Sequence, residues 1–184
     1  MARHLIVFVC TGNVCRSPMA EYLLRGRLDE GLDWRVASAG LSAVDGMPAS
    51  RAAVTILAER HIDLGPHRSR SLGGDLVDAA DLIVVMTASH RDQMRAMFPG
   101  SEGKVSLLKS FDPAAVNEDV LDPIGQPPDT YRMICREIAA ALPGLVSYLK
   151  ALQGVEARRR PRQARGTPKS RGRPGSTNEG GKLE

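Results

Sequence analysis

Two short, apolar runs constrain the fold of this chain more than any other feature of its sequence. They are residues 4–9 (HLIVFV) and residues 81–86 (DLIVVM), and each precedes a segment with helical periodicity. A strand that is apolar on both faces must be covered on both sides, as strands of a parallel sheet between helices are. The alternation of such strands with helices predicts an α/β fold.

Further elements continue this alternation. We expect strands at residues 34–37 and 105–108, and helices at residues 18–30, 50–61, 87–98 and 129–153. Pro18 suits the first turn of the helix at residues 18–30, and Thr87 can cap the helix at residues 87–98. Because proline lacks an N–H group, we expect the last helix to break near residues 143–144.

Charge divides the chain into a body and a tail. A chain of 184 residues is long enough for one ordinary domain, which we place at residues 1–154. Residues 155–184 hold nine basic and three acidic side chains with many glycines and prolines, which predicts a basic disordered tail. The body has a net charge of −2, which argues against a nucleic-acid-binding domain. Weak contact of the tail with RNA is the one nucleic-acid role left open.

Several features indicate a cytoplasmic protein. No apolar run approaches the roughly 18 residues of a membrane span, and the first one is too short for a secretory signal. The odd number of cysteines (Cys10, Cys15 and Cys135) argues against a disulfide framework. Cys10 and Cys15 lie five residues apart without a matching Cys or His pair, so no metal site is expected.

The loop after the first strand carries the chemistry. Ligands of α/β folds bind beyond the carboxyl ends of the strands, and the loop there reads Cys10-Thr11-Gly12-Asn13-Val14-Cys15-Arg16-Ser17. Backbone N–H groups wrapped before a helix start can form an anion nest, and the helix N-terminus adds positive potential.

Individual side chains of this loop suit phosphoryl transfer. Gly12 permits a positive φ and a close approach of the backbone to an anion. Arg16 can hold two phosphate oxygens, and a Cys10 thiolate beneath them can attack phosphorus. Ser17 can donate to the sulfur. Ordinary buried cysteines are the alternative interpretation, but Cys-x5-Arg-Ser between a strand and a helix is a specific combination.

The reaction also needs an acid for the leaving group. The segment of residues 109–128 offers two aspartates that precede proline, Asp112 and Asp122. Proline holds the preceding residue in an extended shape, which helps to fix a carboxylate. The residues alone do not choose between the two.

Four segments resemble the low-molecular-weight protein-tyrosine phosphatase family. They are VCTGNVCRSPMAE (residues 9–21), SAG (38–40), ADLIVVM (80–86) and DVLDPIG (119–125), and the likeness spans roughly residues 4–153. The resemblance implies a central four-stranded parallel sheet and a cysteinyl-phosphate intermediate that water hydrolyses, with no metal or other cofactor.

The resemblance also implies residue roles. Cys10 would be the nucleophile and Asp122 the acid, while Ser17 would assist the thiolate. Asn13, hydrogen-bonded to Ser38, would hold the strained shape of the loop. The phosphate would be bound by Thr11, Gly12, Asn13, Val14, Cys15, Arg16 and Ser17.

The kind of phosphate is indicated less sharply. Ile124 and Gly125 follow Asp122-Pro123, where tyrosine-directed members have aromatic residues. The likeness is closer to the bacterial protein-arginine phosphatase branch, in which a threonine occupies the position of Val14. We expect a monomer that acts on phosphoproteins of the phosphotyrosine type, with phosphoarginine as the alternative.

The cysteine count and the intact site residues argue against two other classes of protein. An arsenate reductase needs more cysteines than Cys15 and Cys135 provide, and intact Cys10, Arg16 and Asp122 argue against a non-catalytic phosphopeptide-binding module. Cys15 is either a packing residue or a partner that protects Cys10 through a disulfide. His67 could lie near the rim of the site, but such a residue is more often simply exposed, and no role is assigned to it.

Overall fold

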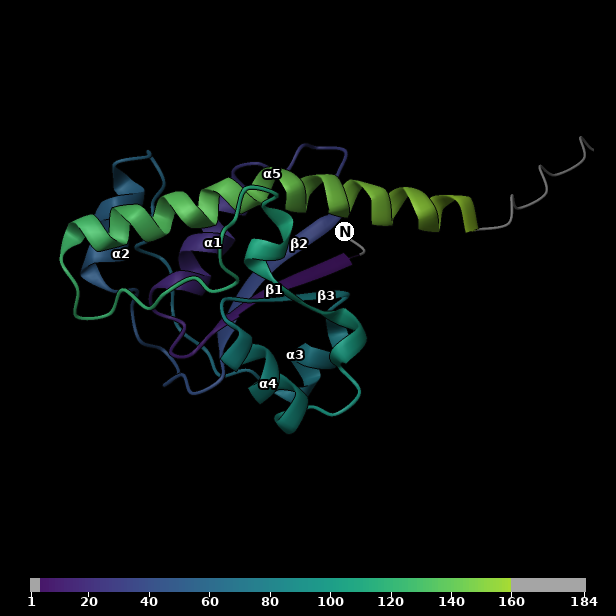
Figure 1. Ribbon diagram of the computed structural model, residues 1–184, viewed down its shortest axis with the longest axis horizontal. Coiled ribbons are helices and arrows are strands. Elements are labelled where there is room, and N and C mark those ends of the chain that lie inside the picture. The colour runs from purple at the N-terminus through teal and green to yellow at the C-terminus, as the bar shows by residue number, and fades with distance from the viewer. Residues whose placement is uncertain (1–3, 160–184) are drawn as a thin grey trace, which may run out of the picture.

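The computed structural model describes residues 4–159 and shows a parallel sheet between two layers of helices (Figure 1). The strand order is β2-β1-β3-β4, and all three pairings are parallel. The strands are β1 (His4–Cys10), β2 (Trp34–Gly40), β3 (Leu82–Val85) and β4 (Val105–Leu107). The α/β fold with a four-stranded parallel sheet is therefore confirmed.

Helices cover both faces of the sheet. They are α1 (Arg16–Arg25), α2 (Arg51–Ala58), α3 (Gly74–Ala79), α4 (Ala88–Met97) and α5 (Pro128–Arg159), with short 3-10 turns η1 (Glu102–Lys104) and η2 (Leu108–Phe111). Helix α3 was not expected, because its six residues (GDLVDA) open with glycine and are too few for a visible helical period.

Alternate side chains of β1 enter two separate cores. Ile6 and Phe8 pack with α1, α2 and α5 on one face, whereas Val7 and Val9 pack with α3 and α4 on the other. Figure 1 shows α1, α2 and α5 on one side of the sheet and α3 and α4 on the other. Strand β1 lies between β2 and β3. The loop that follows its carboxyl end therefore lies between neighbouring strands and not at a side of the sheet.

Helix α5 corrects the expected break near residues 143–144. It is continuous through Pro143, and buried Leu142, Leu145 and Leu149 anchor it to the core on both sides of the proline. The packing of these side chains outweighs the roughly 3 kcal/mol that a proline costs inside a helix. At Gly144 the helix lies against η2, where an added Cβ would come within 2.0 Å of the Phe111 carbonyl oxygen.

Helix α5 also ends later than expected. It continues through Arg159, so residues 155–159 are helical rather than part of a disordered tail. The rest of that tail, residues 160–184, lies outside the described residues, and the division into a domain and a tail stays a prediction. By length and composition alone, α5 could cross a membrane; in this fold its apolar side chains form part of the core.

Candidate active site

The loop of residues 10–17, named the phosphate loop below, joins the end of β1 to the start of α1. Cys10 is the last residue of β1 and is 2% exposed. Its Sγ lies 3.0 Å from Oγ of Ser17, in the first turn of α1. The strand-to-helix turn thus places a buried thiol beside a hydroxyl that can donate to it.

The carbonyl groups of the phosphate loop are bonded to residues outside it. Backbone N–H groups of Leu41, Ser42 and Ser50 donate to the carbonyls of Cys10, Thr11 and Val14 at 2.8–2.9 Å. The peptides of the described residues are trans. In a planar trans peptide the carbonyl and the following N–H point in opposite directions. The N–H groups of Thr11, Gly12 and Cys15 therefore face the inside of the loop.

Asn13 holds the loop through both its backbone and its side chain. It is fully buried, its side-chain Nδ2 donates to Oγ of Ser17 (2.9 Å) and to Oγ of Ser38 (2.8 Å), and its Oδ1 accepts from the Arg70 N–H (2.9 Å). Its φ is 54°, in the left-handed region, whereas Gly12 has no positive φ. The positive φ that glycine would permit at Gly12 thus occurs at Asn13 instead; asparagine tolerates that region because its short polar side chain bonds locally.

A buried carboxylate extends this network away from the loop. Ser38 Oγ donates to Oε2 of Glu21 at 2.5 Å, and Glu21 also forms an ion pair with Arg25 one turn later in α1. Glu21 was not predicted as a site residue, although it is the last residue of the motif at residues 9–21. A carboxylate in the first helix after the loop was a signal that could have been followed.

Gly40 allows β2 to approach the loop closely. A Cβ at this position would lie 2.5 Å from the Thr11 carbonyl oxygen and 3.0 Å from the Asn13 nitrogen. Any other residue here must displace the phosphate loop.

Arg16 joins the loop to the segment before α5. It is 4% exposed, its NH1 donates to the Val120 carbonyl at 3.1 Å, and its NH2 lies 2.5 Å from Oδ2 of Asp122. Asp112 instead accepts from the Ala114 N–H in an exposed turn after η2. Of the two aspartates that precede proline, Asp122 is thus the one paired with the phosphate loop.

The Cys15 side chain contacts Ser50 and Tyr131. Its Sγ donates to Oγ of Ser50 at 3.3 Å and lies 3.4 Å from the hydroxyl of Tyr131, at the start of α5. Burial raises the pKa of the Cys15 thiol, and burial likewise raises the pKa of Tyr131. The three cysteines are free, and Cys135 lies in the core on α5.

Two histidines, His67 and His90, contact the loop. His67 is buried rather than exposed, and its Nε2 lies 2.8 Å from the Asn13 carbonyl oxygen. His90 in α4 is also buried, with Nε2 2.9 Å from Oγ1 of Thr11. Burial and the nearby Arg16 lower the pKa of His90 from 6.5 to about 4, so its ring is neutral at pH 7. Within residues 4–159 no group of His, Cys, Asp or Glu is arranged to hold a metal ion.

This fold and this loop define a class of protein. An α/β sheet whose first strand ends in a buried cysteine, followed by inward N–H groups and a buried arginine, is typical of hydrolases that act on phosphoric monoesters through cysteine. The sequence model of the low molecular weight phosphotyrosine protein phosphatase family matches residues 5–155. This chain belongs to that family.

The relatives of this chain include proteins named as arginine phosphatases and proteins named as tyrosine phosphatases. The chain is 40% identical over 146 residues to a protein-arginine-phosphatase of Bacillus subtilis, covering 79% of this chain and 96% of that protein. It is 38% identical over 138 residues to a probable low molecular weight protein-tyrosine-phosphatase, EpsP, of Ralstonia solanacearum, covering 75% and 93%.

A solved structure agrees with this assignment. The YwlE arginine phosphatase from Geobacillus stearothermophilus is 36% identical, with a TM-score of 0.75 over 83% of this chain and 96% of that chain.

Proposed function

We propose that this chain hydrolyses phosphotyrosine-type phosphoprotein substrates through a cysteinyl-phosphate intermediate. The observation that carries the proposal is the direction of the loop peptides. Their carbonyls are engaged outside the loop, so their N–H groups face the inside of the loop that begins at Cys10, and a dianion bound there is stabilised by donors already oriented toward it.

In the first step, the Cys10 thiolate attacks phosphorus and the bond to the leaving oxygen breaks. Arg16 donates to the equatorial oxygens, where the charge is spread. Asp122 lies 2.5 Å from Arg16 in this structure; once the phosphate takes Arg16 as its partner, Asp122 can be protonated, and it donates that proton to the leaving oxygen. The charge that leaves with the alcohol is thereby neutralised as it forms.

In the second step, water attacks the cysteinyl phosphate and the sulfur–phosphorus bond breaks. The Asp122 carboxylate accepts the proton from water. The Ser17 hydroxyl, 3.0 Å from Cys10 Sγ, donates to the departing thiolate. Phosphate leaves and the resting enzyme returns.

Replacing Asp122 tests this assignment, and Asp112 supplies a matched control that also precedes proline. We expect Asp122→Asn to lower kcat roughly 10²–10⁴-fold with phenyl phosphate, whose phenoxide leaves poorly without a proton. The loss should be smaller with p-nitrophenyl phosphate, whose leaving group needs protonation less. Asp112→Asn should leave both rates near those of the parent. If Asp112→Asn shows the loss instead, the proposed acid is wrong.

Replacing Cys10 tests the nucleophile. Cys10→Ser should abolish turnover of p-nitrophenyl phosphate and still bind vanadate, because the inward N–H groups remain. A Cys10→Ser variant that retains turnover overturns the mechanism, and a parent without phosphatase activity would favour the phosphopeptide-binding alternative.

A pocket beside the loop favours a substrate with an aromatic side chain. It has about 330 Å³ and is lined by Val14, Val44, Met47 and Pro48 together with Gly12, Ser42 and Ser50. No carboxylate lines it among the described residues, so an uncharged ring suits it better than a guanidinium group.

Phosphoarginine is the second candidate substrate. It is favoured by the residues after Asp122-Pro123, since exposed Ile124 provides no aromatic wall, and by the 40% identity to the Bacillus subtilis protein-arginine-phosphatase. The ratio of kcat/KM on phosphotyrosine and phosphoarginine peptides decides between them. We expect the ratio to favour phosphotyrosine and to fall in Val14→Thr; a parent that prefers phosphoarginine makes the second candidate the function.

We also propose that the enzyme is a cytoplasmic monomer. Three free, buried cysteines suit a reducing compartment. Cell fractionation and sedimentation of the full chain test the two statements.

A further inference from the structure

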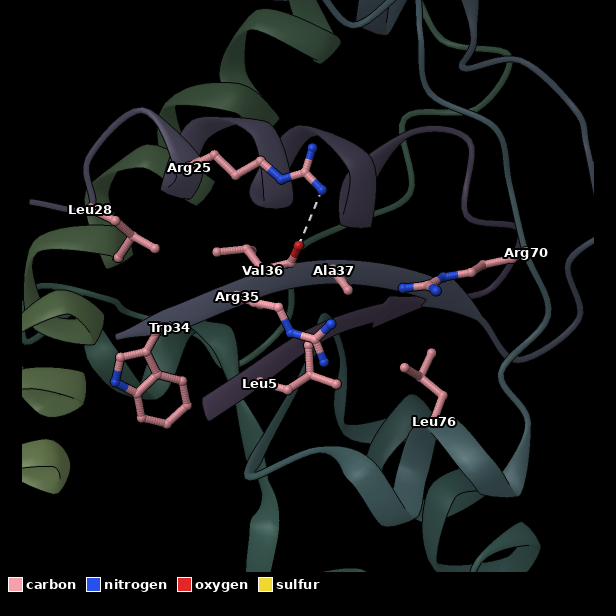
Figure 2. A pocket seen from close by; sticks show the side chains of 9 residues that line it. All are labelled: Leu5, Arg25, Leu28, Trp34, Arg35, Val36, Ala37, Arg70 and Leu76. Atoms are coloured by element: carbon pink, nitrogen blue, oxygen red, sulfur yellow. Dashed lines mark hydrogen bonds between the residues drawn. The ribbon is translucent and has the colours of Figure 1, made fainter. Parts of the chain in front are cut away.

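The edge of β2 carries a pocket that the proposed reaction does not use. It has about 540 Å³, within the size range of small-molecule sites. Strand β2 is an edge strand of the sheet, and the pocket wraps around that edge (Figure 2). None of its lining residues belongs to the phosphate loop.

Three arginines and no acidic side chain line this pocket among the described residues: Arg25, Arg35 and Arg70. Arg25 is neutralised by its ion pair with Glu21 and donates to the Val36 carbonyl at 3.1 Å. Arg35 is exposed and has no hydrogen-bond or ion-pair partner within residues 4–159. The charge of the pocket therefore comes mainly from Arg35 and Arg70.

Arg70 is held in place from behind. Its backbone N–H donates to Oδ1 of Asn13, and its side-chain Nε donates to the Ser38 carbonyl at 2.8 Å. Its terminal nitrogens remain without a protein partner in the described part of the chain. Figure 2 shows the Arg35 and Arg70 guanidinium groups pointing toward each other across the pocket, with the small side chain of Ala37 between them.

Two guanidinium groups that converge without a counter-charge repel each other, and an anion between them removes the repulsion and bonds to both. Guanidinium forks match the oxygens of a phosphoryl group. The other part of the lining is apolar, with Leu5, Leu28, Trp34 and Leu76. The pocket thus combines guanidinium groups with apolar side chains, of which Leu5 and Leu76 lie on the same face of β2 as Ala37.

We propose that the β2-edge pocket is a second ligand site, separate from the phosphate loop, that binds a small organic phosphate. The phosphoryl group lies between Arg35 and Arg70, and the apolar part of the ligand lies against Leu5 and Leu76, which share one face of β2 with Ala37. This site goes beyond the proposed hydrolysis and does not depend on it.

The test uses phenylphosphonate, which has a phosphonate and an apolar ring and cannot be hydrolysed as an ester. Calorimetric titration into full-length Arg16→Met, whose phosphate loop lacks its arginine, should show one bound molecule per chain. Arg35→Ser added to this background should weaken binding at least tenfold. Arg51→Ser, which removes an exposed arginine on α2, should leave binding unchanged.

A second variant tests the site without changing its charge. Ala37→Met fills the space between the two guanidinium groups and should also weaken binding at least tenfold. Should Arg16→Met fail to fold, the parent chain serves instead: it should bind two molecules, and Arg35→Ser one. Inorganic phosphate should bind more weakly than phenylphosphonate.

Three results would overturn the proposal. One is an absence of phenylphosphonate binding to Arg16→Met; another is an affinity that neither Arg35→Ser nor Ala37→Met changes, which would put the anion in the phosphate loop, whose inward N–H groups remain in Arg16→Met, or on other basic residues such as those of residues 160–184. Equal affinities for inorganic phosphate and phenylphosphonate would remove the apolar part of the site.

Discussion

At the scale of single residues, Asn13 connects more parts of the site than its position in the loop suggests. Its side chain forms hydrogen bonds with the side chains of Ser17 and Ser38 and with the backbone N–H of Arg70. Its carbonyl oxygen is hydrogen-bonded to Nε2 of His67. Each buried neutral hydrogen bond contributes about 1 kcal/mol to stability, and groups left without a partner cost more. The shape of the phosphate loop therefore depends on one amide side chain.

Paired substitutions separate the two contributions of Asn13. Asn13→Gly removes the side-chain bonds but tolerates the left-handed φ, and we expect a loss of about 2–4 kcal/mol with a large fall in kcat. Asn13→Ala should be less stable than Asn13→Gly by about 1 kcal/mol, because its Cβ is strained at φ 54°. Urea unfolding measures both, and an alanine variant as stable as the glycine variant would contradict the strain.

His90 should make stability depend on pH. Its folded-state pKa is lowered from 6.5 to about 4, so between these values the unfolded chain binds a proton that the folded chain does not. Stability then falls as the pH decreases through this window, by up to about 1.4 kcal/mol per pH unit. Denaturant unfolding from pH 7 to pH 4 should show a shallower fall in His90→Gln than in the parent. The exposed control His61→Asn should follow the parent, and a His90→Gln profile with the parental slope would refute the assignment.

At the scale of elements, strands and long helices could be predicted from apolar runs and helical spacing, whereas two features could not. Helix α3 has too few residues to show a period, and α5 continues through Pro143 because Leu142, Leu145 and Leu149 are buried around it. A local rule about proline says nothing of the packing that opposes it.

Two glycines of α5 test how tightly this helix packs. At Gly144 an added Cβ would lie 2.0 Å from the Phe111 carbonyl oxygen, whereas at Gly154 it would meet nothing within 4 Å. Glycine costs about 1 kcal/mol in a helix relative to alanine. Gly154→Ala should therefore raise the melting temperature, and Gly144→Ala should lower it by the equivalent of about 1–3 kcal/mol. A Gly144→Ala variant more stable than the parent would contradict the close contact.

At the scale of the whole molecule, the site combines a local motif with distant supports. Cys10, Arg16 and Ser17 are read from one loop, and Glu21 lies in the helix that follows it, but His67 and His90 had no such signal. The two histidines bond loop atoms from 54 and 79 residues away. Contacts of this kind depend on how the chain returns to the sheet edge, which no short pattern encodes.

The two ends of α5 lie at opposite ends of the strands. Tyr131 contacts Cys15 at the phosphate loop, while Gln153 accepts from the Asp33 N–H just before β2 (Figure 1). Both contacts lie within residues 4–159, so a chain that ends at Arg159 keeps them. Removing residues 160–184 should leave kcat/KM for p-nitrophenyl phosphate within about twofold, because this ratio depends on groups at the reacting centre and on the residues that support them. Steady-state assays of the chain ending at Arg159 measure this, and a tenfold loss would show that the segment takes part in catalysis.

Crystals of the full chain soaked in tungstate would examine whether the first loop holds a dianion above sulfur. The account places one tetrahedral oxyanion there, bonded by inward N–H groups and by Arg16, with its tungsten next to Cys10 Sγ. A loop that stays empty at saturating tungstate, or one whose carbonyl oxygens face the ion, would contradict it.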